Sequence, residues 1–264
     1  MKVMEIRGIR FSYGRQEVLK GVDMDFYHGT FYGILGPNGC GKSTLLKNLY
    51  GYLRPSGGSI TLGGSSLAQM KPRERARKIA YVPQDSYIGF DFTVFDVIAM
   101  GRNPHHSPLD SLGRHDMEMI ETAMEETGTQ HLRDKSVNEL SGGEKQRTLL
   151  ARAFAQDSDI ILMDEPVSML DINHQIEIMD LARSMADDKL KTIICVLHDL
   201  NLAAQYAQHI FLMKDGTVIR AGIPDVILDA DIIRETYGAT VYIGDNGITG
   251  TRIVIPVSRL NNPF

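Results

Sequence analysis

Residues 36–44 read Gly36-Pro37-Asn38-Gly39-Cys40-Gly41-Lys42-Ser43-Thr44, which fits the phosphate-loop pattern G-x-x-x-x-G-K-[ST]. The glycines permit positive φ and a close approach of the backbone to a ligand. Successive backbone N–H groups can then form a concave anion site. Lys42 can reach the β- and γ-phosphates as a point charge, and the Ser43 hydroxyl is placed to bind Mg²⁺. The stretch therefore predicts a phosphate-binding site.

The residues on both sides of this loop support that prediction. Residues 31–35 read as a short buried strand, and residues 43–50 as a helix with Leu45, Leu46 and Leu49 on one face. A helix N-terminus that points at phosphate adds its dipole to the site. An ordinary glycine-rich loop is therefore a poor explanation of the pattern.

Composition limits the class of protein. The chain has 264 residues, 43% of them hydrophobic, and a net charge of −5, which argues against a nucleic-acid partner. No apolar run approaches the roughly 20 residues that a membrane span needs, and charge follows Met1 too soon for a signal peptide. The two cysteines, Cys40 and Cys195, indicate no disulfide framework and fit a reducing cytosol.

Two apolar runs, residues 160–163 and 192–197, read as buried parallel strands that end in polar side chains. Asp164 and Glu165 follow the first, at the sheet edge where α/β proteins bind ligands. Asp164 would bind Mg²⁺ through its carboxylate, and Glu165 would remain available as a base for water. His198 follows the second strand. Because the phosphate loop and the two carboxylates are expected at the same edge of the sheet, a functional role is favoured for it.

Ser141 begins a second helix of interest, with Glu144 at capping-box spacing. Gly142 and Gly143 lie at its start. Two interpretations remain open: a well-capped structural helix, or a second helix N-terminus that holds phosphate.

The remaining pattern indicates a mixed architecture. Antiparallel strands are expected in residues 1–30, a helical insert in residues 85–139, and a hairpin around Asp215-Gly216. Within the insert, helices are expected at 94–100 and 117–127, and a loop at 101–106. His105 and His106 in that loop are interpreted as solvated polar residues and not as metal ligands. Residues 231–264 read as a short helix followed by strands.

Together these motifs resemble the ATP-binding cassette (ABC) ATPases over about the first 220 residues. Residues 36–44 match Walker A, residues 160–165 Walker B, and residues 140–144 the ABC signature. The resemblance implies the Q-loop glutamine at Gln84, the D-loop aspartate at Asp171 and the switch histidine at His198. Spacing alone makes Tyr13 a sheet aromatic, whereas the resemblance implies that it stacks on adenine.

Three further stretches, residues 97–105, 170–175 and 198–203, look like those of importer subunits for iron-siderophore, heme and cobalamin uptake. Val167 and Met169 differ from the residues that are usual in the family at these positions. The resemblance therefore does not predict which dimer contacts these two residues make.

The resemblance implies a fold and a mechanism. The fold is an α/β P-loop NTPase core with a mainly parallel sheet, an antiparallel β-subdomain and a helical insert. The cofactors are ATP and Mg²⁺, the latter held by Ser43, Gln84 and Asp164. Glu165, His198, Gln84 and Lys42 form the catalytic set. The nucleotide contacts are Tyr13, the loop from Gly36 to Thr44, Ser141, Gly142, Gly143 and Asp171.

The implied organisation is a domain over residues 1–230, with a helical subdomain at about 85–155, and a small packed extension over 231–264. The implied partners are a second copy in a head-to-tail dimer, an integral membrane permease and an external substrate-binding protein, at the cytoplasmic face of the membrane. The alternative is a soluble ABC ATPase, such as an iron–sulfur assembly component. The cargo is not readable from this chain.

Overall fold

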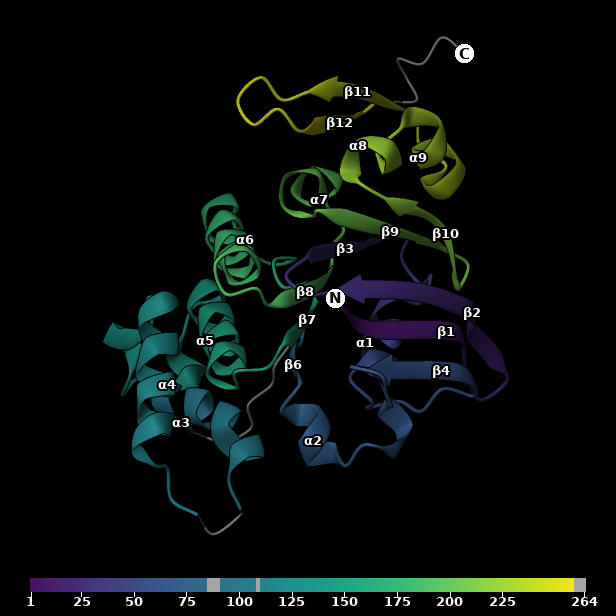
Figure 1. Cartoon of the computed structure of the whole chain (residues 1–264). Coiled ribbons are helices and arrows are strands. Elements are labelled where there is room, and N and C mark those ends of the chain that lie inside the picture. The colour runs from purple at the N-terminus through teal and green to yellow at the C-terminus, as the bar shows by residue number, and fades with distance from the viewer. Residues whose placement is uncertain (85–90, 108–109, 259–264) are drawn as a thin grey trace. The chain divides into compact units, whose positions relative to one another are not determined.

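The computed structural model describes residues 1–84, 91–107 and 110–258. The chain forms two compact units, the first from Met1–Ala68 with Ile194–Phe264 and the second from Gln69–Ile193 (Figure 1). The expected helical subdomain at about 85–155 falls within unit 2, and its residues 85–90 and 108–109 lie outside the described part. The expected extension, 231–264, falls within unit 1, where residues 259–264 lie outside it.

Unit 1 holds the predicted antiparallel strands. β1 (Lys2–Tyr13), β2 (Gln16–Tyr27), β4 (Gly57–Leu62) and β5 (Ser65–Ser66) form a sheet in the order β2-β1-β4-β5. Val22, Met24 and Phe26 are buried in alternation along β2, as a sheet with one covered face requires.

The strand that leads into the phosphate loop also belongs to unit 1. β3 (Phe31–Leu35) is buried at every position and lies parallel to β9 (His209–Lys214), which pairs antiparallel with β10 (Thr217–Gly222). The predicted hairpin around Asp215-Gly216 is thereby confirmed. After the loop comes α1 (Lys42–Leu49), whose leucines are buried.

The C-terminal segment packs on the same unit. It comprises α8 (Pro224–Ile227), α9 (Ala230–Tyr237), β11 (Val241–Asp245) and β12 (Arg252–Pro256). The Asn201 side chain, on α7 (Leu200–Tyr206), accepts from Val254 N at 2.7 Å and donates to Val254 O at 3.3 Å. Two hydrogen bonds between the Asn201 amide and the Val254 backbone therefore attach the β11–β12 hairpin to α7.

Unit 2 contains the strands that end in carboxylates. β6 (Ile79–Val82) runs parallel to β7 (Ile160–Asp164), and every residue of β7 is buried. β8 (Thr192–Val196) begins in unit 2, where Thr192 N–H donates to Asp159 O at 2.9 Å. It ends in unit 1, where the Leu197 N–H donates to Ile34 O at 3.2 Å. Both predicted buried strands are confirmed, and the parallel pairing of β7 with β6 agrees with the prediction.

Helices make up the rest of unit 2. α3, α4 and α5 pack on one another and form the predicted helical insert (Figure 1). The helical elements are α2 (Pro72–Ala76), α3 (Val94–Ala99), α4 (Arg114–Glu126), α5 (Gly142–Ala155) and α6 (Ile172–Asp187), with short 3₁₀ turns η2 (Met100–His105), η3 (Gln130–Leu132) and η4 (Val137–Glu139). One further 3₁₀ turn, η1 (Leu67–Gln69), begins in unit 1 and ends in unit 2.

The loop expected at 101–106 was a wrong prediction. Residues 100–105 form η2, and Arg102 within it is only 3% exposed. Its guanidinium donates to Asp116 Oδ1 at 2.9 Å and to Ala155 O at 2.7 Å. A buried charge needs such partners, and partners 14 and 53 residues away leave no local pattern in the sequence.

The two histidines of this turn are not simply solvated, which corrects their interpretation. His106 Nε2 lies 2.7 Å from Asp116 Oδ1, and His105 Nε2 lies 2.9 Å from Gln156 O. Burial is the main cause that lowers the pKa of His105. Both imidazoles therefore brace η2 against α4 and the end of α5.

Candidate active site

The phosphate loop in unit 1 owes its shape to glycine. Gly36 has φ +151°, and a Cβ there would lie 2.2 Å from Met213 O and 2.9 Å from Cys40 Sγ. Gly41, with φ +104°, has Leu19 Cδ2 at 3.0 Å from the same position. No side chain fits at either glycine without a shift of its neighbours, and the positive φ values add backbone strain. The loop is thus held in one conformation by packing from behind.

Lys42 lies over this loop and concentrates positive charge there. Its ammonium donates to Gly36 O at 2.8 Å and to Pro37 O at 3.1 Å, and the residue is 4% exposed. The first N–H groups of α1 lie at the same point and have no partners within the helix. Ser43 and Thr44 are half-buried in the first turn. Ammonium and helix N-terminus together make a strong anion site.

Three other residues of unit 1 were expected near the nucleotide. Tyr13 ends β1 and is 50% exposed, and its ring makes an edge-to-face contact with Phe11 at a centroid distance of 4.9 Å. His198 is exposed just beyond β8. Cys40 is buried, and burial is the main cause that raises the pKa of its thiol, which stays protonated at neutral pH.

Unit 2 positions the two carboxylates differently. Asp164 is 3% exposed and accepts a hydrogen bond from the Tyr81 hydroxyl at 3.0 Å. Glu165 follows with φ +50°, which turns the chain out of the strand. Gln84 Nε2 donates to Glu165 Oε2 at 2.8 Å. The structure thus brings the predicted Q-loop glutamine and the predicted base into direct contact.

The expected metal ligands have the right chemistry for magnesium. Ser43 offers a hydroxyl, Gln84 an amide oxygen and Asp164 a buried carboxylate. Mg²⁺ prefers hard oxygen ligands together with substrate phosphates, and buried Asp164 gains from a nearby cation. The donor set therefore fits the ion.

The start of α5 is built as predicted. Ser141 is the N-cap: its hydroxyl accepts from Glu144 N at 3.4 Å, and Glu144 Oε2 accepts from Ser141 N at 2.8 Å. Bonds from the Ser141 hydroxyl and N–H are the main cause that lowers the pKa of Glu144. Gly142 is exposed at the helix start, and Gly143 is buried. The Ser141 capping box is confirmed, and the exposed Gly142 backbone remains open to a ligand.

Asp171 is the N-cap of α6, which begins at Ile172. Its carboxylate accepts from His174 N at 3.0 Å and lies 2.9 Å from His174 Nδ1. These two contacts, the backbone one first, lower the pKa of Asp171.

Sequence reasoning missed Tyr81 and His174. Tyr81 carried a weak signal, since it stands in a short strand next to Pro83 and Gln84. His174 stands three residues after an N-cap aspartate, which places its backbone N–H and its ring within reach of that carboxylate.

The match to known proteins identifies the class. The sequence profile described as "ABC transporter" matches residues 19–168, more than half of the chain. The chain belongs to the ABC transporter family. The ABC ATPase is 38% identical over 97% of its length to the ferric enterobactin transport ATP-binding protein FepC of Escherichia coli (strain K12), of which it covers 96%. It is 39% identical over 97% of its length to the hemin import ATP-binding protein HmuV of Gloeobacter violaceus, of which it covers 94%.

Solved structures agree with this assignment. A metal-chelate-type ABC transporter in an inward-facing conformation contains a chain that superposes with a TM-score of 0.86, at 26% identity, over 98% of this chain and 99% of that one. The cassette MJ0796, solved as a dimer with ADP and Pi, gives a TM-score of 0.74 at 26% identity, over 84% and 98% of the two chains. The ABC ATPase has the predicted fold, an α/β core with parallel and antiparallel sheets and a helical insert. None of its described helices is long and apolar enough to cross a bilayer.

Proposed function

We propose that this ABC ATPase is the ATP-hydrolysing subunit of a membrane importer for a metal chelate of the siderophore, heme or cobalamin type. The observation that carries the proposal is similarity along nearly the whole chain to ATP-binding proteins of ferric enterobactin, hemin and cobalamin import. The subunit would sit at the cytoplasmic face of the membrane, on a permease served by an external substrate-binding protein.

Different residues of the chain have different roles in ATP binding and hydrolysis. Lys42 and the loop from Gly36 to Thr44 hold the phosphates, and Tyr13 stacks on adenine. Glu165 orients the attacking water, and His198 contacts the γ-phosphate. A magnesium ion held by Ser43, Gln84 and Asp164 would neutralise phosphate charge. Phosphoryl transfer needs positioning and charge stabilisation more than covalent chemistry from the protein.

We propose a head-to-tail pair of copies as the active form, in which Ser141, Gly142, Gly143 and Asp171 of one copy meet the nucleotide of the other. The support comes from unit 2. Met169 is 79% exposed, Ile172 77% and Ile176 43%, so large apolar side chains face solvent around Asp171. Such a cluster beside a candidate site is typical of an interaction surface.

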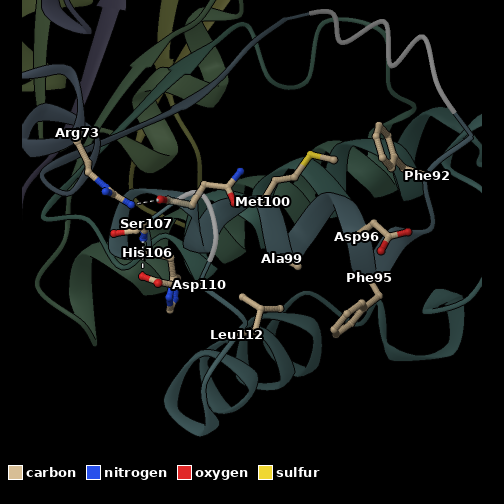
Figure 2. A pocket seen from close by; sticks show the side chains of 11 residues that line it. Arg73, Phe92, Phe95, Asp96, Ala99, Met100, His106, Ser107, Asp110 and Leu112 are labelled. Carbon is tan, nitrogen blue, oxygen red and sulfur yellow. Dashed lines mark hydrogen bonds between the residues drawn. The ribbon is translucent and has the colours of Figure 1, made fainter.

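A groove in unit 2 supports the permease as partner. A cavity of about 770 Å³ lies in this unit. Figure 2 shows Phe92 and Phe95 at one end of it and Arg73, His106 and Asp110 at the other. Ala99, Met100 and Leu112 line it between them. Since relatives are subunits of membrane importers, we propose that a cytoplasmic helix of the permease binds here. One end of the groove, at Phe92, lies a few residues after Gln84 in the sequence. A change at Gln84 on nucleotide binding would therefore be transmitted to the permease.

Ala99→Arg tests this partner, because the new side chain fills the groove. We expect wild-type protein expressed in its native host to co-purify with an integral membrane protein in detergent, and Ala99→Arg to lose it while ATP affinity stays the same. The matched control is Glu125→Arg, on the exposed face of α4. Recovery of a soluble assembly partner in place of a membrane protein would contradict the importer and support the soluble alternative.

A further inference from the structure

His174 connects two parts of unit 2 to which the proposed function gives separate roles. Its ring Nδ1 and its backbone N–H both contact the carboxylate of Asp171, at 2.9 and 3.0 Å. The same ring packs on Gly143 at the start of α5: a Cβ built there would lie 2.4 Å from His174 Cδ2 and 2.9 Å from Nε2. One imidazole therefore touches both the D-loop aspartate and the signature glycine.

The contact explains why residue 143 is glycine. Gly143 is buried, has no positive φ and lies inside a helix, where alanine would ordinarily be preferred. The His174 ring occupies the space that a methyl group would need. At the neighbouring position, a Cβ on Gly142 would meet Leu170 Cδ2 at an ordinary 3.7 Å. The close approach is thus specific to Gly143.

A second attachment, one turn further along both helices, holds α5 and α6 together. Arg147 Nη1 donates to Glu177 Oε2 at 2.7 Å, and Asn173 Nδ2 donates to Glu177 Oε1 at 2.9 Å. With this pair in place, the His174 ring sets the spacing of the two helix starts. It lies 31% exposed between them.

We infer that His174 is a positioning residue that joins the start of α5 and Asp171 into one rigid half-site, which each copy presents to the nucleotide of the other. The inference rests on the proposed head-to-tail pair. Because the half-site acts on the other copy's nucleotide, His174 contributes to pairing and leaves ATP binding by a single chain unaffected. The phosphate loop of each chain does that binding.

The test measures ATP-dependent pairing in a Glu165→Gln background, where ATP persists, by analytical ultracentrifugation. We expect His174→Ala to raise the dissociation constant of the ATP-bound pair about tenfold, because the variant loses one charge-assisted hydrogen bond. His174→Asn keeps an N–H donor near the position of Nδ1 and should recover most of the pairing. ATP affinity at protein concentrations where the chain is monomeric should be equal in all variants. Ser184→Ala, an exposed change on α6 whose hydroxyl donates to Leu181 O within the same helix, is the control.

A double-variant cycle tests the ring contact independently. Gly143→Ala should weaken pairing because its methyl group collides with the imidazole, and His174→Ala added to it should restore part of the loss. Pairing of His174→Ala equal to the background, or an Asn variant as weak as the Ala variant, would overturn the inference. A background that fails to pair with ATP at all would instead overturn the head-to-tail proposal.

Discussion

At the scale of the residue, the site depends on two polar contacts inside unit 2. Gln84 holds one oxygen of Glu165, and Tyr81 holds one oxygen of Asp164. Each carboxylate is thereby fixed by a neutral donor, which orients it without cancelling its charge. These contacts support the proposed roles of Asp164 toward a cation and of Glu165 toward water.

Glu165→Gln removes the proposed base and preserves its size. We expect ATP turnover to fall by about 10²–10⁴-fold, the usual contribution of general acid–base catalysis, while ATP affinity is retained. Phosphate release measures the ATP turnover, and titration with a fluorescent nucleotide measures the ATP affinity. Glu139→Gln, an exposed change in η4, serves as the control. Unchanged turnover in Glu165→Gln would remove the catalytic assignment.

Tyr13 tests the adenine contact. Tyr13→Ala should weaken ATP binding by about 5- to 150-fold, because stacking of a base on an aromatic ring contributes ~1–3 kcal/mol. Tyr13→Phe should bind like the wild type, since the ring face is retained. Titration of each variant with labelled ATP gives the dissociation constants. An Ala variant that binds as tightly as Phe would show that the ring stays away from the base.

At the scale of the element, η2 is attached to the helical insert by a buried charge cluster. Burial opposes ionisation of Asp116, but hydrogen bonds from His106, Arg102 and Gly113 N–H outweigh it and hold the pKa of Asp116 well below its ordinary value. The cluster ties η2 to α4 and to the end of α5, and so shapes one wall of the groove in Figure 2.

Asp116→Asn leaves Arg102 buried without its counter-charge. We expect the free energy of unfolding to fall by about 3–5 kcal/mol, the cost of breaking a buried pair, as measured by urea titration. Glu118→Gln, in an exposed pair with Arg114 on the same helix, should change it by less than about 1 kcal/mol. Equal losses in the two variants would contradict the role of the cluster.

The same cluster sets a pH dependence. Because the folded pKa of Asp116 lies below the unfolded value of 3.8, its contribution is complete above that pH and is lost as the pH falls through 3.8 toward the folded pKa. The melting temperature of the wild type should therefore drop more steeply below pH 4 than that of Asp116→Asn. Parallel profiles for the two proteins would disagree with this assignment.

The sequence predicted elements better than the contacts between them. The apolar runs at residues 160–164 and 31–35 predict buried strands, and the Ser141–Glu144 spacing predicts a helix cap. These predictions succeed because each feature depends on residues that are close together in the sequence. Arg102 gave no such signal, because its partners Asp116 and Ala155 are brought to it by packing, and a helical turn was therefore taken for a loop. His174 offered only its three-residue spacing from Asp171, and its contact with the distant Gly143 left no pattern in the sequence.

At the scale of the whole molecule, each chain holds one phosphate loop, in unit 1, and one signature helix start, in unit 2. Family membership and the fold show an ATPase, and the proposed pairing would give the start of α5 a phosphate to bind although each chain has a single Walker loop. We propose that the two helix starts of one chain serve two different nucleotides.

Mixing two inactive variants tests that claim most directly. Lys42→Ala disables the phosphate loop, and Gly142→Asp places a carboxylate where phosphate would meet α5, a change that a helix N-terminus tolerates. Each variant alone should hydrolyse almost no ATP. In a head-to-tail pair the mixture contains one intact site per mixed dimer, so an equal mixture that pairs at random should regain about a quarter of the wild-type sites. Continued inactivity of the mixture, with mixed dimers shown to form, would contradict the account.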